Sequence, residues 1–358
     1  MAGENPSFTV QQLLDQGRAA YNALRLEEAL ASYQQVLALQ PTNYEAHLGL
    51  ARTLSRMRRL DEAHAAVQRC LELDPQRAEG YAALGMVGFL RDQYDQAAQA
   101  LTKAIELSPE DPEAHLTLAQ VYADMKKFTE AWGELEAARD LIAALPSAEQ
   151  GGLLAFSWHV ETYLKLAEGR TQEAMEAAQE VLSYEDANPH AAALALANLG
   201  ILEARARHYD LAIEYLERAY QLDPFFYRAG SALGRLLIIR GQAERAAQIL
   251  GEVVAKMPGA EKSTRYAYAL ALNKAGRRQE ALAQYRQALQ EGLTGIDALA
   301  ARWQVIWLSP VGRYVIVGLI LAAVAAWLIL AKPSPQSLTL MVLLVVILLL
   351  QRAWRSRR

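Results

Sequence analysis

Cysteine is almost absent from this chain: Cys70 is the only one among 358 residues, so no disulfide can form within it. A glycosylation sequon is also missing, since Asn5 is followed by Pro6, and the N-terminus shows no basic start followed by an apolar run. These features are typical of secreted proteins, and their absence argues against export.

Motifs of catalysis and cofactor binding are equally scarce. The patterns HExxH and GxGxxG do not occur, nor does the phosphate-binding GxxxxGK followed by Ser or Thr. No two histidines have the spacing of a metal-binding pair on one helix. The six are His47, His64, His115, His159, His190 and His208. We expect Cys70 to be a packing residue, and we predict no enzymatic activity, no cofactor and no metal site.

Negative charge is missing from the end of the chain. Residues 301–358 contain seven Lys or Arg and no Asp or Glu, which leaves 29 basic and 40 acidic residues in residues 1–300. An acidic body is a poor nucleic-acid binder, because phosphate contacts need clustered cations. A basic segment that flanks apolar runs suits an anionic membrane surface.

What the sequence does have is an internal repeat of 34 residues. Pro41, Pro75 and Pro109 keep this spacing, as do Pro224 and Pro258. A second series is formed by alanines in the same period: Ala29, Ala63, Ala97 and Ala131, then Ala212 and Ala246, with Ala281 35 residues later. Alanine suits a point where two helices nearly touch, and proline ends a helix because its predecessor is biased away from helical dihedrals.

This period and these positions resemble the tetratricopeptide repeat (TPR), a helix-turn-helix unit of 34 residues. The resemblance covers roughly residues 8–293 and gives eight units. It implies an all-α fold, a right-handed superhelix of about eight helix-turn-helix repeats.

Two departures interrupt the period. Ala131 and Ala174 are 43 residues apart, and Ala174 and Ala212 are 38 apart. The first gap contains residues 145–152, and the fifth unit has Glu161–Thr162 where its neighbours have Leu–Gly or Leu–Ala. We therefore predict repeats 1–4 in residues 8–143 and repeats 5–8 in residues 144–293, joined by an altered turn or by lengthened helices.

The tail predicts a two-helix transmembrane hairpin with a basic end, in residues 310–358. Residues 314–331 form an uncharged, mostly apolar run of 18 residues, long enough at about 1.5 Å per residue to cross a bilayer. Residues 332–337 form a polar turn with two prolines, and residues 338–350 are apolar except for Thr339. The second run is short, so a re-entrant or buried helix is an alternative to a full span. Basic residues outside the turn predict a multi-pass membrane protein with the repeats and both termini cytoplasmic.

Residues 294–309 lie between the repeats and this hairpin. Ile296, Leu299, Trp303, Ile306 and Trp307 fall on one face of a predicted helix. Such a helix can cap the last repeat, which a repeat array requires, or lie on lipid as an interfacial helix.

The resemblance also implies where a partner binds, because the first helices of TPR pairs line a concave groove. Carried onto this chain, the groove positions are Arg18, Tyr21, Arg52, Arg56, Met86, Phe89, Tyr163 and Arg235, together with Phe156, His159, Arg205, Ile238 and Asn273. The Lys-and-Asn clamp of chaperone-binding TPRs is missing, since Leu14 and Arg18 occupy the matching first-repeat positions. The arginines favour an acidic protein segment with an aromatic or aliphatic anchor, although each is also compatible with a solvated face, and the aromatic residues with helix packing.

The sequence thus predicts a non-enzymatic, membrane-anchored scaffold or assembly factor on a bacterial-type membrane, binding a peptide segment or a helix of a protein partner in the groove. The alternative is a stable structural subunit of a larger membrane complex, docked through the hairpin. An enzymatic function is a third possibility, but the repeats, the capping helix and the hairpin leave no stretch for a catalytic domain.

Overall fold

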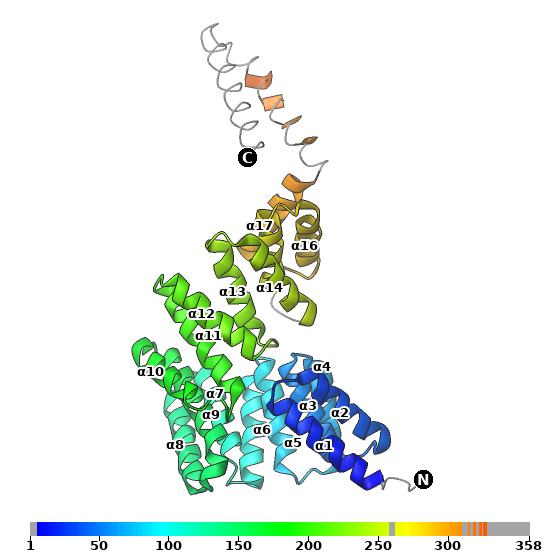
Figure 1. Cartoon of the computed structure of the whole chain (residues 1–358), viewed down its shortest axis with the longest axis vertical. Helices are drawn as coiled ribbons and strands as arrows, with labels where there is room; N and C mark the ends of the chain where they lie inside the picture. The colour runs from blue at the N-terminus through cyan, green and yellow to red at the C-terminus, as the bar shows by residue number, and fades with distance from the viewer. Residues whose placement is uncertain are drawn as a thin grey trace. The chain divides into compact units, whose positions relative to one another are not determined.

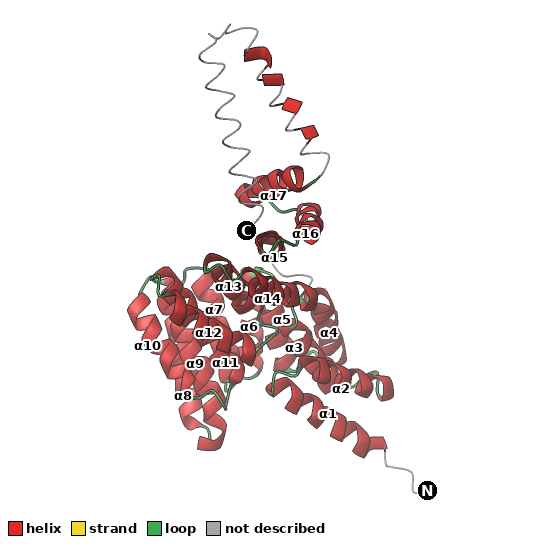
Figure 2. Cartoon of the chain, turned by 45° about the horizontal axis from the view of Figure 1, so that its top comes forward, coloured by secondary structure: helices red, strands yellow, loops and turns green. Residues whose placement is uncertain are grey.

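The computed structural model describes residues 6–257 and 262–309, and beyond them residues 314–315, 318–319, 322–323 and 325–327. Over these residues the chain forms seventeen helices and no strand (Figure 1, Figure 2). The helices are α1 (Pro6–Asn22), α2 (Leu26–Leu39), α3 (Tyr44–Arg56), α4 (Leu60–Leu73), α5 (Ala78–Leu90), α6 (Tyr94–Leu107), α7 (Pro112–Asp124), α8 (Phe128–Ala144), α9 (Ser147–Ala167), α10 (Thr171–Leu182), α11 (Pro189–Arg205), α12 (Tyr209–Leu222), α13 (Tyr227–Ile239), α14 (Ala243–Lys256), α15 (Lys262–Lys274), α16 (Arg278–Gln290) and α17 (Gly295–Leu308). The predicted all-α class and its TPR-like helix pairs are confirmed for this part of the chain.

The chain divides into two compact units. The array unit is Met1–Arg277 and contains α1 to α15, and the C-terminal unit is Arg278–Arg358 and contains α16 and α17. In the array unit α1 packs on α2, α3 on α4, and so on to α13 on α14. The boundary predicted at residues 143 and 144 falls at the end of α8, where α9 packs on both α7 and α8.

The recurrent alanines lie at buried positions of the second helices. Every alanine of the series is fully buried: Ala29, Ala63, Ala97, Ala131, Ala174, Ala212, Ala246 and Ala281. A glycine of the first helix faces a large side chain of the second helix, one turn after the recurrent alanine. A Cβ added at Gly85 would collide with the Leu101 side chain, and one added at Gly200 would lie 2.7 Å from Leu216 Cγ. Small and large side chains therefore alternate across the helix pairs, as a close-packed core requires.

The turn inside each pair repeats the same backbone conformation. Leu24, Arg58, Asp92 and Lys126, each 34 residues from the next, have φ of 58–59°. Around Arg58 the amide of Arg59 donates to Leu54 O at 2.9 Å and that of Arg58 donates to Ser55 O at 3.0 Å. This is the Schellman motif, which satisfies the last carbonyls of the first helix through a left-handed residue. Glycine occupies the corresponding position only in later repeats, as at Gly241.

Lys126→Gly should raise the free energy of unfolding by about 0.5–1 kcal/mol, because a side chain with a Cβ is disfavoured in the left-handed region. The matched reverse change, Gly241→Ala, should lower it by about 1 kcal/mol. An added Cβ at Gly241 meets no atom within 4 Å, so that variant changes only the backbone preference. Urea denaturation followed by circular dichroism measures both, and two unchanged midpoints would contradict the left-handed turn.

The long gap between the fourth and fifth repeats comes from lengthened helices. α8 has 17 residues and α9 has 21, whereas each helix from α2 to α6 has 13 or 14. The irregular residue Glu161 is buried and forms an ion pair with Lys165 at 2.6 Å and another with Arg139. An ionic triad thus takes the place of the leucine that the neighbouring units have at this position, as at Leu118 and Leu199.

In the C-terminal unit, α17 packs against α16 and buries Ala298 and Ala301. The five large apolar residues predicted to share a face of this helix are exposed. None of the helices in the described ranges combines the length and the apolarity that crossing a bilayer requires. The hairpin predicted in residues 310–358 lies almost entirely outside the described residues, apart from nine helical, exposed residues between 314 and 327.

Candidate binding groove

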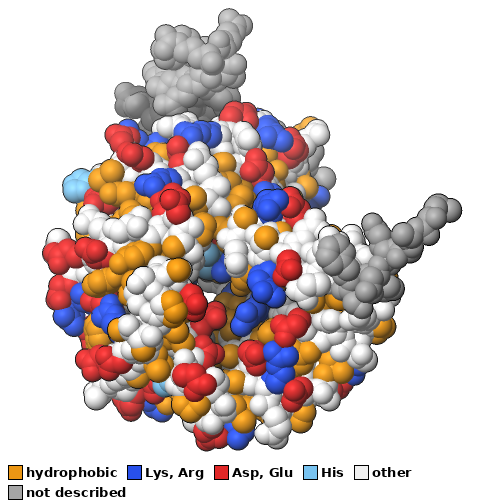
Figure 3. Space-filling model, turned by 60° about the horizontal axis from the view of Figure 1, so that its bottom comes forward, with side chains coloured by type: hydrophobic (Ala, Val, Ile, Leu, Met, Phe, Trp, Pro, Cys, Tyr) orange, Lys and Arg blue, Asp and Glu red, His pale blue; other side chains and the backbone are white. Residues whose placement is uncertain are grey.

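The odd-numbered helices form the inner side of the array unit. From α1 to α15 each packs against the next odd-numbered helix, as α3 does on α5 and α5 on α7. The space-filling view shows the molecule hollowed near its centre, with basic and acidic side chains gathered around the hollow (Figure 3). We therefore treat the inner side as the candidate groove.

Two of the predicted arginines gather at the N-terminal part of this side. Arg52 on α3 reaches Glu113 on α7 at 4.0 Å, and Arg18 on α1 lies 4.0 Å from Asp15. Both arginines act on the buried hydroxyl of Tyr33: burial raises the pKa of Tyr33, and the two positive charges oppose that rise. Although burial would lower the pKa of Arg52, the Glu113 carboxylate contributes to raising it, so this side chain stays charged.

These ion pairs are longer than most others in the array, although Arg277 and Glu244 are 3.9 Å apart. Arg59 and Glu62 approach to 2.7 Å, and Lys103 and Glu106 approach to 3.0 Å. Arg52 also keeps 42% of its side chain exposed. A cation held at 4.0 Å in contact with water has weak pairing energy, about 0–1 kcal/mol, and exchanges easily for a better-placed carboxylate.

Arg56 lies in a different environment from Arg18 and Arg52. Its guanidinium stacks 4.3 Å from the ring centroid of Tyr21. Its positive charge also acts on His190 and on Asp223, whose Oδ2 accepts a hydrogen bond from His190 Nδ1 at 2.8 Å. Burial and the charge of Arg56 lower the pKa of His190, so the imidazole is neutral at pH 7 and donates to Asp223. The charge of Arg56 on repeat 2 therefore acts on Asp223 at the end of α12.

An apolar cluster accompanies this link, and we call it the seam. It consists of buried Leu26, Phe225 and Met257, with Tyr21, Met57 and Tyr227 packed around them. Arg58 adds a cation–π contact, 5.8 Å from the ring centroid of Tyr227. The seam joins the first two repeats to α13 and the end of α14, which are five to six helix pairs away along the chain. The array unit thus closes on itself, and its helices surround the hollow.

Sequence reasoning missed the seam, although one signal was available. Phe225 and Phe226 occupy the turn after Pro224, and Tyr227 begins α13. The turn after Pro75 has instead Gln76 and Arg77, and that after Pro109 has Glu110 and Asp111. Aromatic residues in a turn that is elsewhere polar indicate a further packing surface.

Four further predicted groove residues have surroundings of their own. Met86 is half-buried, and Phe89 packs against Tyr94 with ring centroids 6.2 Å apart. Tyr163 donates a hydrogen bond to Asp124, and burial raises its pKa. Arg235 is exposed on α13. Phe89 and Tyr163 thus contribute to helix packing, and the structure does not bring either of them to the arginines.

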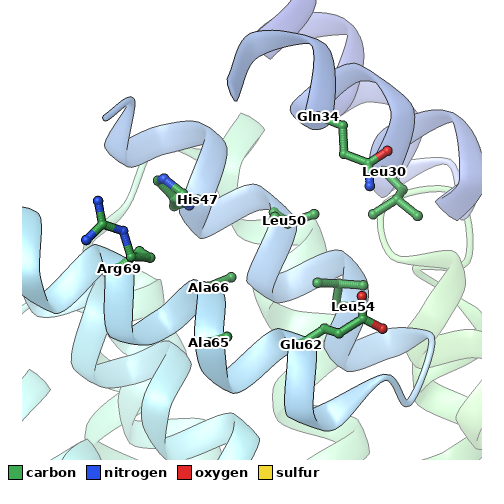
Figure 4. Close-up of a pocket in the computed structure, with 9 residues that line it drawn as sticks. All are labelled: Leu30, Gln34, His47, Leu50, Leu54, Glu62, Ala65, Ala66 and Arg69. Carbon is green, nitrogen blue, oxygen red and sulfur yellow. The ribbon is translucent and has the colours of Figure 1, made fainter. Parts of the chain in front are cut away.

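A separate crevice of about 330 Å³ lies on the outer side, between α2 and α4 above α3 (Figure 4). Leu30, Leu50 and Leu54 line it, and Gln34, His47, Glu62 and Arg69 surround them. The crevice is open and its polar groups come from three helices without converging on one point. It shows no arrangement for a specific small ligand.

Neither a metal-ion grouping nor an activated thiol is found in the part of the chain that the structure describes. The described residues contain no group of three or more His, Cys, Asp or Glu side chains suited to a metal ion. Cys70 is buried, with its thiol 3.9 Å from Tyr44 O, and burial raises its pKa to about 11. At neutral pH the thiol is protonated and a poor nucleophile.

Comparison with known proteins supports the same fold. A tetratricopeptide repeat model matches residues 13–87 and 203–272, a TPR repeat model matches residues 87–126, and another tetratricopeptide repeat model matches residues 163–225. No curated protein matches the sequence. A similar solved structure is a chain of the APC/C hetero-tetramer Cut9-Hcn1, with a TM-score of 0.57 and 16% identity. The match covers 82% of this chain and 54% of that one, so this chain spans about half the length of its structural relative.

Proposed function

The chain belongs to the tetratricopeptide-repeat family, and on that premise we propose that it is a non-catalytic scaffold that binds an acidic segment of a protein partner in the hollow of its array unit. The observation that carries this proposal is the pair Arg18 and Arg52, two cations on the inner side whose carboxylate partners lie 4.0 Å away. A carboxylate-bearing segment gains specificity and association rate from such charges. Tyr21 beside them offers a flat apolar contact.

The double change Arg18→Glu and Arg52→Glu should weaken binding of an acidic peptide by about tenfold or more at low salt, equivalent to about 1.4 kcal/mol. The probe is a fluorescent twelve-residue peptide with alternating Asp and Glu and one Trp, measured by anisotropy. We leave Arg56 unchanged because its charge faces Asp223 across the seam.

The matched control is Arg59→Glu with Lys103→Glu, which changes the net charge equally at two exposed pairs. It should leave binding within about twofold, since only long-range charge is altered. Equal weakening by both double variants would show that net charge alone attracts the peptide, and would contradict a binding site at Arg18 and Arg52.

We further propose that residues 310–358 anchor the scaffold in a membrane, with the array and both termini on the cytoplasmic side. The apolar runs, the basic flanks and the single Lys332 in the intervening turn support this topology. Assembly of a membrane complex is the process that best fits an anchored scaffold.

A thiol-labelling experiment tests the topology with Ser334→Cys and Arg358→Cys, each in a Cys70→Ser background. A membrane-impermeant maleimide added to intact cells should label the Ser334→Cys variant strongly and spare the Arg358→Cys variant until the cells are lysed. The reverse pattern would overturn the orientation, and equal labelling of both would contradict a membrane hairpin.

The second candidate function is that of a stable subunit of a membrane complex. The seam favours this function because a closed ring suits a permanently bound partner. Purification separates the two functions. A subunit should co-purify with its complex at fixed stoichiometry, whereas an assembly factor should be present only in incomplete complexes.

A further inference from the structure

Helix α17 presents two opposite faces of different character. Ala298 and Ala301 are buried on one face, which packs against α16. On the other face Ile296 is 82% exposed, Leu299 63% and Trp303 55%. Ile306 and Trp307 extend this exposed face, and the rings of Trp303 and Trp307 stack with centroids 6.5 Å apart. Its packing within the C-terminal unit uses the small residues and leaves the large apolar ones in contact with water.

The chemistry around this face indicates what covers it. The described residues that follow α17 continue the apolar exposure in helical conformation, with Tyr314 78% exposed and Leu319 65% exposed. From residue 301 onward the chain has seven Lys or Arg and no acidic residue. Tryptophan is enriched at the boundary between headgroups and acyl chains, and basic residues are attracted to anionic lipids.

A second copy of the chain is a poorer occupant. The 14 residues of α17 extend about 21 Å, so one face about 10 Å wide offers about 200 Å². A stable protein interface buries about 800 Å² on each partner. A lipid surface has no such requirement, because an amphipathic helix with aromatic anchors binds it through its own apolar face.

We propose that α17 lies flat in the headgroup region of an anionic bilayer, with Leu299, Trp303 and Ile306 inserted into the acyl boundary. This inference rests on the membrane anchoring proposed above and deepens it. Together with the Ala298 and Ala301 contact, it fixes α16 against the membrane surface. It also gives α17 a role separate from spanning, since at about 21 Å it is too short to cross a hydrocarbon core of about 30 Å.

Site-directed spin labelling of the full-length protein in vesicles of phosphatidylcholine and phosphatidylglycerol tests this orientation. Single cysteines are introduced in a Cys70→Ala background at Leu299→Cys and Ile306→Cys on the exposed face, and at Asp297→Cys beside it. A fourth site, Ala325→Cys, reports on the proposed hairpin. Power saturation compares accessibility of each label to oxygen, which enters lipid, and to a nickel chelate, which stays in water.

We expect the labels at Leu299 and Ile306 to be several-fold more accessible to oxygen relative to nickel than the label at Asp297. If Ala325 is in lipid while Leu299 and Ile306 are as accessible to nickel as Asp297, the anchoring stands and the interfacial placement is overturned. If Ala325 is also in water, the anchoring fails and the interfacial placement fails with it. Dipolar broadening at Leu299 that dilution with unlabelled protein relieves would show a second copy on this face, and would likewise overturn the placement.

Discussion

Glu161→Gln should destabilise the array unit by about 3 kcal/mol, because it leaves the largely buried Lys165 and the partly exposed Arg139 without their counter-ion. The Glu161 side chain is 10% exposed and that of Lys165 is 14% exposed, so both charges have lost most of their hydration. Arg139 keeps 33% exposure and also stacks 4.7 Å from the Trp158 ring centroid. Removing one partner of a buried ion pair typically costs about 3–5 kcal/mol. We expect the lower end of that range because Arg139 still reaches water. Urea denaturation monitored by circular dichroism measures the loss.

The same triad makes stability depend on pH in a defined direction. Burial alone would raise the pKa of Glu161, but hydrogen bonds from Lys165 and Arg139 hold it below its ordinary value of 4.5. Because the folded-state pKa of Glu161 is lowered, its contribution to the free energy of unfolding is fully present above pH 4.5. That contribution is lost as the pH falls through the lower pKa of the folded state. The difference between the wild type and Glu161→Gln should therefore narrow below about pH 4.5.

Two controls separate the buried triad from ordinary surface pairing. Glu62→Gln removes an exposed partner of Arg59, and it should cost less than about 1 kcal/mol. The triple change Arg139→Met, Glu161→Leu and Lys165→Leu should return stability close to that of the wild type, since apolar packing often replaces a buried ionic cluster without loss. A Glu161→Gln variant as stable as Glu62→Gln would show that the triad is open to water.

The repeat itself could be predicted from the sequence because it depends on local features. A 34-residue period with a small residue at Ala63 and Ala97 fixes helix pairing and the buried face, and the structure confirms both. The left-handed turn residues could not be identified by type, since Leu24, Arg58 and Lys126 all adopt a conformation usually associated with glycine. There the Schellman hydrogen bonds and the packing of the pair override side-chain preference.

The candidate site was harder to predict because it depends on the curvature of the whole array. The family pattern predicts Arg18 and Arg52 on the inner side, and in the structure the charges of both act on the hydroxyl of Tyr33. Closure of the ring depends on small rotations summed over many repeats, which a period does not reveal. The lengthened α8 and α9 alter that sum, so Phe225 and its contact with Leu26 emerge only from the folded structure.

Leu26→Ala and Phe225→Ala should each destabilise the array unit strongly, by about 2–5 and 3–5 kcal/mol respectively, because each removes a large buried side chain. Leu26 is fully buried and Phe225 is 6% exposed, although the two residues belong to repeats at opposite ends of the array unit. In an open solenoid each repeat is coupled only to its neighbours. Across a closed seam, the double variant should instead show a coupling energy of about 1 kcal/mol or more.

The control cycle pairs Phe225→Ala with Leu101→Ala. Leu101 is also fully buried, but it packs against Leu118 and Val121 and not in the seam. Its loss should add to that of Phe225 within about 0.5 kcal/mol, as expected for distant sites. Additivity in both cycles would show that the ring is open in solution. An open ring would leave the hollow accessible from the side, whereas a coupled seam requires a partner segment to enter along the axis or to separate Leu26 from Phe225 first.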